Sequence, residues 1–264
     1  MPTPANVDYR SDPRTRVVLI PAWNQGQCGS CWACASVACI EASYARQIGT
    51  GLPFLSVQHV LDACTQRRGY DSCTSCKGGL VGQAVRFAER EGLLQEAVHP
   101  YSGSDQKWHR RKHLWKQRCF PVLQSVEVWS KSETCLLSTV LQALDVLGPL
   151  VLTFTIGDKP LFKFVVGSDS PIWRGPWAAV DPTAKGSFEH HAVLIVGYSS
   201  RSASCMEPHF IMQNSWGAAK PNEGVFYVPV TEMPHFGRIL GVQCRSYLPG
   251  PRRWLRALCW AAVA

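Results

Sequence analysis

The amino-acid sequence predicts an α+β fold in two lobes, on the strength of three observations. Helical patterns fill the first part of the chain, and short β-rich runs dominate the second part. Hydrophobic residues make up 46% of the 264 residues and charged residues 17%, a balance that buries a core and excludes a disordered chain. Helices first and strands later are typical of an α+β protein, and a cleft between two such lobes is a natural place for a site.

Four segments show the apolar spacing of a helix. They are Cys31–Ile48, Ser56–Cys64, Leu80–Glu91 and a segment near Glu133–Leu147. Helix boundary signals support the first three: Ser30 and Ser56 stand at N-cap positions, and Gly49 and Gly92 follow as stops. The first of these helices is expected to be largely buried, because apolar residues occupy most of its length.

The strands are expected later in the chain. Runs rich in β-branched and aromatic residues occur at 151–156, 191–198, 209–215 and 224–230. No internal repeat interrupts this order, so one globular unit with two lobes is the architecture that the pattern favours.

The charge is positive overall, with a formal value of +8 at pH 7. Much of the excess lies in two stretches, Lys107–Arg118 and Pro251–Arg256. We interpret these as a solvated loop and a tail, and expect no nucleic-acid partner; binding of a polyanion through Lys107–Arg118 is the alternative. No apolar run approaches the ~18 residues that would cross a bilayer, so no membrane span is expected.

Twelve cysteines are more than a reduced cytosolic protein of this size carries, and they do not form two CxxC pairs that would close a zinc site. An oxidising compartment is therefore expected: lysosomal, vacuolar or secreted. The first residues, MPTPANVDYR, do not match a signal peptide, so we expect that an export signal lies outside this chain or that the gene model starts late. No metal or organic cofactor is implied.

A candidate nucleophile lies at the start of the first helix. The string NQGQCGSCW places Cys31 in the first turn, where unpaired N–H groups and the positive end of the dipole favour a thiolate. The plainer interpretation is a buried or disulfide-bonded cysteine. Against it stands Gln25, whose amide can donate to the oxyanion of a tetrahedral intermediate together with the backbone N–H of Cys31.

A base and an orienting residue follow in the β-rich part. His191 opens the apolar run HAVLIVGY, so its ring can be held at a strand start facing the cleft. Asn214, in QNSWG, supplies an amide able to orient the imidazole, and Trp216 can cover that hydrogen bond from water. A nucleophile, a base and an orienting amide in the order Cys, His, Asn indicate acyl-transfer chemistry.

These motifs resemble those of the papain family of cysteine peptidases over roughly Val7 to Pro249. The family signature C-G-[SA]-C-[WY] is matched by residues 28–32. The other strings that resemble the family are Val7-Asp8-Tyr9-Arg10, Leu55-Ser56-Val57-Gln58 through Cys64, Cys76-Lys77-Gly78-Gly79, His191 to Tyr198 and Asn214 to Gly217.

The resemblance implies a papain-like two-lobe fold: an N-terminal helical lobe, mainly 24–120, and a C-terminal β-barrel-like lobe, mainly 121–249, with the active-site cleft between them. Residues 1–249 would form the peptidase domain and 250–264 a basic tail. It also implies that Cys31 is the nucleophile, His191 the base, Asn214 the orienting residue and Gln25 the oxyanion donor. Residues implied to bind substrate are Gly78, Gly79, Leu80, Val81, Glu189, Ala192 and Trp216.

Disulfides carry over from the family in part. The resemblance implies a bridge between Cys28 and Cys76, and makes one between Cys64 and Cys119 plausible, with Cys73 as a competitor for Cys64. Two departures from the family pattern stand close to the catalytic residues. His190 replaces the usual Asp or Asn before the histidine, and Cys34 occupies the usual aromatic position after the nucleophile.

Within the family, the strings from Gly92, from Asp181 and between Tyr198 and Asn214 resemble the cathepsin C subgroup, whose members release dipeptides from free N-termini. These members use an exclusion domain for that purpose, and the 264 residues hold no counterpart of it, so dipeptide release is implied by likeness only. Chloride binding and oligomers are implied on the same ground. Peptide or protein substrates are expected; an endopeptidase and a catalytically silent binding module are the alternatives.

Overall fold

The computed structural model describes residues 6–11, 21–48, 54–66, 68–108, 114, 117–118, 123–130, 137–156, 171–175, 177, 189–218 and 223–244. The predicted tail at 250–264 lies outside these residues, as do Cys119 and most of the basic stretch. The helices are α1 (Cys31–Ile48), α2 (Val57–Cys64), α3 (Val81–Glu91) and α4 (Leu137–Leu147), with 3-10 turns η2 (Ser75–Lys77) and η4 (Val230–His235).

Helix α1 has the bounds that the sequence predicts. Helix α2 begins directly after its predicted cap, because the Ser56 hydroxyl accepts a hydrogen bond from the His59 N–H at 2.9 Å. At the start of α1, the Ser30 carbonyl accepts from the N–H groups of Ala33 and Cys34, both at 2.9 Å. Helix α4 is described from residue 137, and the predicted start at 133 lies outside the described residues.

Within the described part of the chain, the strands form one antiparallel sheet in the order β2-β7-β3-β4-β5-β6, and β1 pairs with β4. The strands are β1 (Asn6–Asp8), β2 (Leu123–Ser130), β3 (Leu150–Ile156), β4 (Glu189–Ser199), β5 (His209–Gln213), β6 (Val225–Pro229) and β7 (Phe236–Cys244). The four predicted strands are β3 to β6. Strands β1, β2 and β7 were not predicted.

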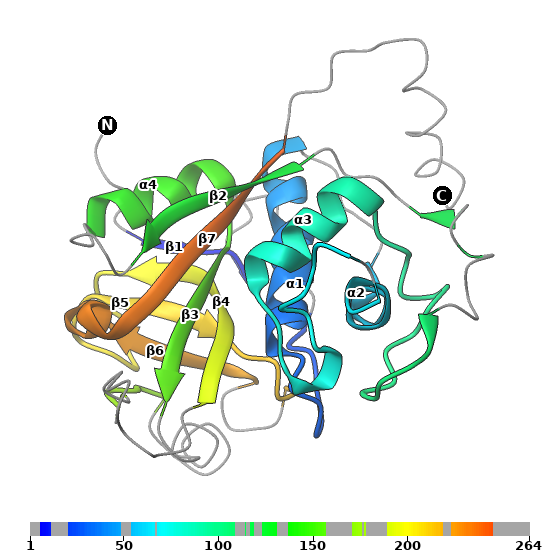
Figure 1. Cartoon of the computed structure of the whole chain (residues 1–264). Coiled ribbons are helices and arrows are strands. Elements are labelled where there is room, and N and C mark those ends of the chain that lie inside the picture. The colour runs from blue at the N-terminus through cyan, green and yellow to red at the C-terminus, as the bar shows by residue number, and fades with distance from the viewer. Residues whose placement is uncertain are drawn as a thin grey trace.

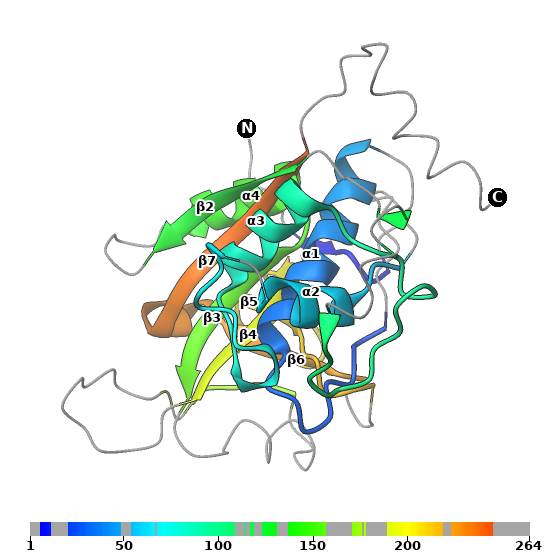
Figure 2. The same cartoon turned by 45° about the vertical axis from the view of Figure 1, so that its right-hand side comes forward.

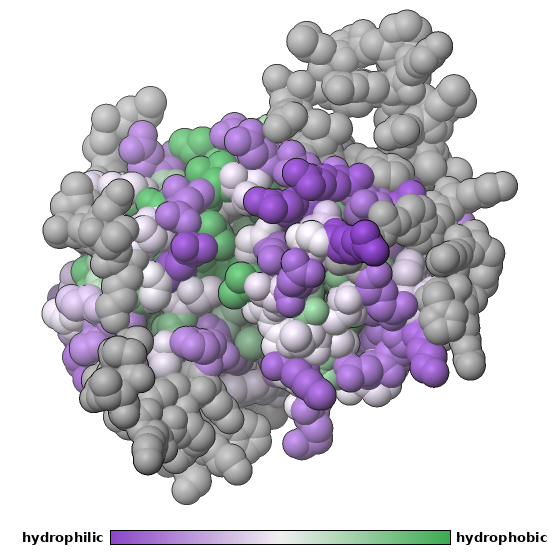
Figure 3. Space-filling view, in the orientation of Figure 1, coloured by the Kyte–Doolittle hydropathy of each residue, from purple (hydrophilic) through white to green (hydrophobic). Residues whose placement is uncertain are grey.

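The α+β, two-lobe architecture that the sequence predicts is confirmed. Figure 1 shows α1, α2 and α3 on one side and the strands with α4 on the other, and Figure 2 shows α1 packed beside the sheet. Hydrophilic residues predominate over α3 in the view of Figure 3, as expected for a helix with one exposed face.

Strand β4 lies at the junction of the two lobes. Its side chains alternate between the two faces of the sheet. Ala192 and Leu194 belong to the core that α1, α2 and α3 build, whereas Val193 and Ile195 belong to the core under α4. The strand therefore joins both hydrophobic cores, and a residue at its start is held by both lobes.

The described ends of the basic stretch take part in the fold. Trp108 is 3% exposed, and its ring lies 4.6 Å from that of His59 on α2. Arg118 donates to the Glu91 backbone oxygen at 2.5 Å and forms an ion pair with the Glu91 carboxylate at 3.3 Å. Trp108 therefore packs in the core and Arg118 pairs with Glu91. The predicted solvated loop is wrong at these two positions.

Candidate active site

Cys31 is the first residue of α1 and is 9% exposed. The first N–H groups of a helix have no partner within it, and the dipole is positive there, so this position stabilises a negative charge. Figure 1 and Figure 2 show that α1 and β4 begin at the same, lower end of the molecule. The first turn of α1, the start of β4 and the turn after β5 meet around a small cavity lined by Cys34, Ala35, Ala192 and Asn214 among others.

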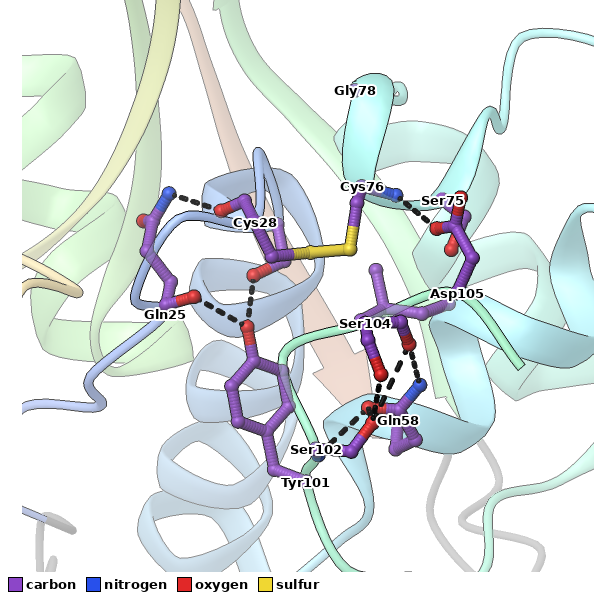
Figure 4. The surroundings of a disulfide bond; sticks show 12 residues. Gln25, Cys28, Gln58, Ser75, Cys76, Gly78, Tyr101, Ser102, Ser104 and Asp105 are labelled. Atoms are coloured by element: carbon purple, nitrogen blue, oxygen red, sulfur yellow. Dashed lines mark hydrogen bonds between the residues drawn. A yellow bond between two sulfur atoms is a disulfide. The ribbon is translucent and has the colours of Figure 1, made fainter.

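A disulfide between Cys28 and Cys76 holds the loop that leads into α1 (Figure 4). This is the pairing that the family resemblance implies. The Gly29 N–H donates to the Cys76 carbonyl at 2.8 Å, and a Cβ on Gly29 would stand 2.6 Å from that oxygen. Glycine is therefore required for the loop to lie this close to its neighbour.

Gln25 is buried, 7% exposed, and its side-chain amide is held at both ends. Its Nε2 donates to the Cys28 carbonyl at 2.8 Å, and its Oε1 accepts from the Ser215 hydroxyl. An amide nitrogen carries two hydrogens. With one hydrogen engaged by Cys28, the other is fixed in direction and can serve as a donor in the site.

Tyr101 supports the same loop from the helical lobe, as Figure 4 shows. Its hydroxyl donates to the Gln25 carbonyl at 2.9 Å and lies 2.7 Å from the Ser30 hydroxyl. Burial raises the pKa of Tyr101 to about 12, so the phenol stays protonated and keeps its donor. Sequence reasoning missed Tyr101 and Ser215, whose contacts with the loop join positions 76 and 190 residues apart.

His191 is buried, 6% exposed, and its Nε2 lies 2.8 Å from the Asn214 Oδ1. That oxygen also accepts a hydrogen bond from the Ser215 N–H at 2.8 Å. A backbone N–H can only donate, so the Asn214 atom facing both groups must be the oxygen. Nε2 of His191 therefore carries the proton in the neutral ring, and Nδ1 is left as the basic nitrogen.

Aromatic side chains enclose this hydrogen bond. Trp216 stacks on the His191 ring at 4.8 Å, and Phe154 meets it edge-on at 5.8 Å. Burial lowers the pKa of His191 to about 4, although the hydrogen bond to Asn214 acts in the opposite direction. His190 lies on the opposite face of β4, where it is exposed and contacts the Thr155 hydroxyl at 3.1 Å, so the two rings are separated by the strand.

The burial of His191 gives an expected pH dependence of stability. The unfolded ring titrates near its ordinary pKa of 6.5, and the folded ring near about 4. Between these values the unfolded state binds more protons, so the free energy of unfolding falls as the pH is lowered. We compare two variants: Cys31→Ala, which carries no thiolate, and the variant that combines Cys31→Ala with His191→Gln. Between about pH 7 and about pH 4.5, the free energy of unfolding of the first should fall by about 2 kcal/mol more than that of the second. Urea unfolding of both variants at both pH values measures this, and equal losses would contradict it.

Hydrogen bonds join the two parts of the site directly. The Gln25 N–H donates to the Ser215 carbonyl at 2.8 Å, and the Gly217 N–H donates to the Trp23 carbonyl at 2.7 Å. The segment before the nucleophile helix therefore pairs with the segment that carries Asn214 and Trp216. The structure thus brings Gln25, Asn214 and His191 into one connected arrangement beside the start of α1.

The residues implied to bind substrate lie on both sides of this arrangement. Gly78 ends η2 with a φ of +122°, and a Cβ on Gly79 would stand 2.5 Å from the Trp32 ring, so both positions require glycine. Leu80, at the start of α3, is 54% exposed. The others are buried Val81 and Ala192, half-buried Trp216, and Glu189, whose backbone pairs with Ile156 at the start of β4.

The second predicted disulfide partner, Cys119, lies outside the described residues. Cys64 lies with its Sγ 2.6 Å from that of Cys73, the alternative partner. The geometry therefore favours the competitor for this bridge. Among the residues that the structure describes, no three or more His, Cys, Asp or Glu side chains are arranged to hold a metal ion, and no helix has the length and apolarity to cross a membrane.

Comparison with known proteins identifies the family. The family described as "Papain family cysteine protease" matches residues 3–235. The chain belongs to this family.

Papain-family relatives include a cathepsin L-like proteinase from Phaedon cochleariae, 29% identical over 81% of this chain and 57% of the relative. Thiol protease aleurain from Arabidopsis thaliana is 29% identical over 84% of this chain and 55% of its own, and cathepsin K from Mus musculus is 29% identical over 84% and 58%. The chain thus spans little more than half the length of these papain-family relatives.

Two solved structures share the fold of this chain. The Carica candamarcensis cysteine protease CMS1MS2, in complex with E-64, has a TM-score of 0.67 at 22% identity, covering 92% of this chain and 99% of its own. The bromelain protease from Ananas comosus, in complex with the E64 inhibitor, has a TM-score of 0.65 at 23% identity, covering 92% and 100%. The papain-like fold that the sequence predicts is therefore confirmed.

Proposed function

We propose that this papain-family chain is a cysteine peptidase that hydrolyses peptide bonds through an acyl-enzyme on Cys31. The observation that carries the proposal is the orientation of His191. Because the Ser215 N–H fixes the Asn214 oxygen, His191 Nε2 donates to Asn214 and Nδ1 is the nitrogen available to exchange a proton with a thiol.

The first half of the reaction forms the acyl-enzyme. The Cys31 sulfur attacks the substrate carbonyl carbon, while the thiol proton resides on His191 Nδ1. A thiolate beside the ring raises the pKa of His191 again, since an opposite charge favours the protonated imidazole and opposes the effect of burial. The carbonyl π electrons move onto the oxygen, which accepts hydrogen bonds from the second Nε2 hydrogen of Gln25 and from the Cys31 backbone N–H. His191 then gives its proton to the amide nitrogen, the C–N bond breaks as the carbonyl re-forms, and the amine leaves.

The second half releases the acid. Water loses a proton to His191 as it attacks the acyl carbon, and the thiolate leaves as the C–S bond breaks. Trp216 and Phe154 exclude bulk water from the Asn214 hydrogen bond throughout, so the ring keeps one orientation in both halves.

The oxyanion role of Gln25 gives an expected kinetic result. Gln25→Ala removes one donor aimed at the developing charge, so kcat should fall about 10²- to 10³-fold with little change in KM. Steady-state kinetics on a fluorogenic peptide amide measures this. Ser215→Ala is the matched control: it removes only the hydroxyl that holds the Gln25 oxygen, and should cost less. A Gln25→Ala variant with unchanged kcat would contradict the role.

The substrate class is a finer proposal. The strings from Gly92 and Asp181 support a cathepsin C-like release of N-terminal dipeptides, whereas the relatives reported above carry the names cathepsin L-like proteinase, aleurain and cathepsin K. Endopeptidase cleavage is the candidate that those names favour. The peptidase domain is proposed to cover 1–249, with 250–264 as a tail, and a lysosomal, vacuolar or secreted compartment stays a prediction.

One experiment separates these activities. Two fluorogenic dipeptide amides are compared in the presence of thiol, identical except that one has a free amino terminus and the other is N-acetylated. Cleavage of the free amine alone indicates dipeptide release, and cleavage of both indicates an open-cleft peptidase. Cleavage of neither, with no labelling of Cys31 by the epoxide E-64, would overturn the peptidase proposal and favour a silent binding module.

A further inference from the structure

A second thiol lies in the same helical turn as the candidate nucleophile. The string C-W-A-C at 31–34 places Cys31 and Cys34 three residues apart at the start of α1. Residues three apart on a helix share a face, with Cβ atoms about 5 to 6 Å apart. Helix geometry therefore places the Cβ atoms of Cys31 and Cys34 within about 1 to 2 Å of the separation in a disulfide, whose Cβ atoms are about 3.5 to 4.5 Å apart.

Cys34 is sealed inside the protein. It is 1% exposed, and its Sγ lies 3.7 Å from the Ser30 hydroxyl. Burial raises the pKa of Cys34 to about 12, and the negative charge of Cys31 acts in the same direction. Cys34 is therefore a protonated thiol at rest, which leaves Cys31 as the thiol of this pair that an oxidant meets first.

The surroundings leave room for Cys34 to move. Its side chain lines the small cavity between α1 and β4, together with Ala35 and Ala192. Trp23 and Leu194 also line this cavity, and the alanines leave space on the walls of α1 and β4 into which the Cys34 side chain can change rotamer. The first turn of a helix also has fewer internal hydrogen bonds to lose than a turn in its middle, so tightening it by 1 to 2 Å, roughly the difference between the two Cβ separations, is less costly there.

We propose that Cys34 is a resolving cysteine, which forms a reversible disulfide with Cys31 when a hydroperoxide oxidises Cys31. The inference goes beyond the proposed peptidase function and assigns a modification site within the first turn of α1. The disulfide takes the nucleophile out of use, and a thiol reductant returns it.

The chemistry balances over two steps. The Cys31 thiolate attacks one oxygen of hydrogen peroxide, the O–O bond breaks, and Cys31 becomes a sulfenic acid as hydroxide leaves; the hydroxide takes up the proton that the Cys31 thiol had given to His191 and becomes water. The Cys34 sulfur then attacks the Cys31 sulfur, the S–O bond breaks, and the Cys34 proton leaves with the hydroxyl as water. In total, the two thiols lose two electrons, and one peroxide gains them and becomes two waters.

The other cysteines near α1 are less suited to this role. Cys28 and Cys76 are already joined to each other. Cys39 lies more than one further turn along the helix, where its thiol donates to the Pro149 carbonyl at 3.2 Å. Cys39 is thus a matched control: a buried thiol on the same helix, outside any disulfide of the described residues and beyond the reach of Cys31.

The test is a mass measurement on the whole chain. The protein is reduced mildly, treated with hydrogen peroxide, alkylated, unfolded and digested with chymotrypsin, which cuts after Trp32 and separates Cys31 from Cys34. The peptide that carries Cys31 also carries Cys28 and is already joined to the Cys76 peptide. We expect peroxide to add a link from this pair to the Cys34 peptide, with the loss of two hydrogen atoms for that link, and all three peptides to separate on reduction. Cys31 found instead as a sulfinic acid, or joined to Cys28 or Cys76, would overturn the proposal.

Variants add a readout of reversibility. After peroxide, the parent protein and Cys39→Ser should regain most of their E-64 labelling when a thiol is added, whereas Cys34→Ser should lose that recovery because its Cys31 is oxidised irreversibly. Equal recovery by Cys34→Ser would count against the proposal. Because the mass measurement needs no turnover, it remains decisive if the peptidase activity is absent or if Cys34→Ser fails to fold.

Discussion

Cys31→Ala should reduce peptide hydrolysis to the background rate and leave the fold intact. The sulfur is the atom that bonds to substrate in the proposed reaction, and no other group in the site can replace it. Alanine is the best helix former, and Cys31 is the first residue of α1, so the substitution removes only a small side chain from the start of the helix. Turnover of a fluorogenic peptide amide, measured with circular dichroism and thermal unfolding on the same sample, tests both parts.

The control for that variant lies on the same helix. Cys39→Ala removes a buried thiol that lies eight residues along α1 from Cys31 and donates to the Pro149 carbonyl, so this variant should keep its turnover even if it lowers stability. Full activity of Cys31→Ala would contradict the assignment of Cys31 as the nucleophile. Loss of activity in both variants would indicate that α1 itself had been disturbed.

His191→Ala is expected to lower kcat/KM about 10⁴-fold or more. The ring takes part in both proton transfers, and it stabilises the thiolate that attacks, so its removal acts on each step of the reaction. The remaining rate should lose its dependence on the titration of an imidazole. A pH profile of kcat/KM for the parent and the variant measures both the loss and the change of shape.

The adjacent residue provides the matched control. His190 is a histidine on the same strand, exposed on the opposite face of β4 and in contact with Thr155 rather than with Asn214. His190→Ala should therefore leave kcat/KM close to the parent value, because it removes neither the Asn214 hydrogen bond nor a group that faces His191. A larger loss in His190→Ala than in His191→Ala would reverse the assignment of the base.

Much of the fold could be predicted from local pattern, and β7 shows where this stops. The strand contains Gly237 and Gly241, which a sequence pattern treats as breakers of a strand. In the structure a Cβ on Gly237 would stand 2.7 Å from the Thr153 carbonyl, and one on Gly241 2.6 Å from the Leu147 side chain. Both glycines are needed for close packing with segments about ninety residues away, a requirement that no local window contains.

The site divides in the same way. Gln25, His191 and Asn214 could be predicted because each stands in a string whose residue types already suit its chemistry. The hydroxyls that hold Gln25 in place could not, since Tyr101 and Ser215 reach the loop from separate elements, and serines and tyrosines are common in loops of any function. The NSWG string does place Ser215 beside Asn214, but the tertiary fold decides which group the Ser215 hydroxyl contacts.

The pairing between the segments at Trp23 and Gln25 and at Ser215 and Gly217 bears on the entropy of the reaction. Drawing the lobes apart at this point would break these hydrogen bonds, at about 1 kcal/mol net each, so the nucleophile helix and the base strand keep a fixed relative position. The freedom that a thiol and an imidazole must lose to act together is therefore lost when the chain folds. A substrate then meets groups that are already aligned, and its binding energy remains available to orient the peptide bond itself.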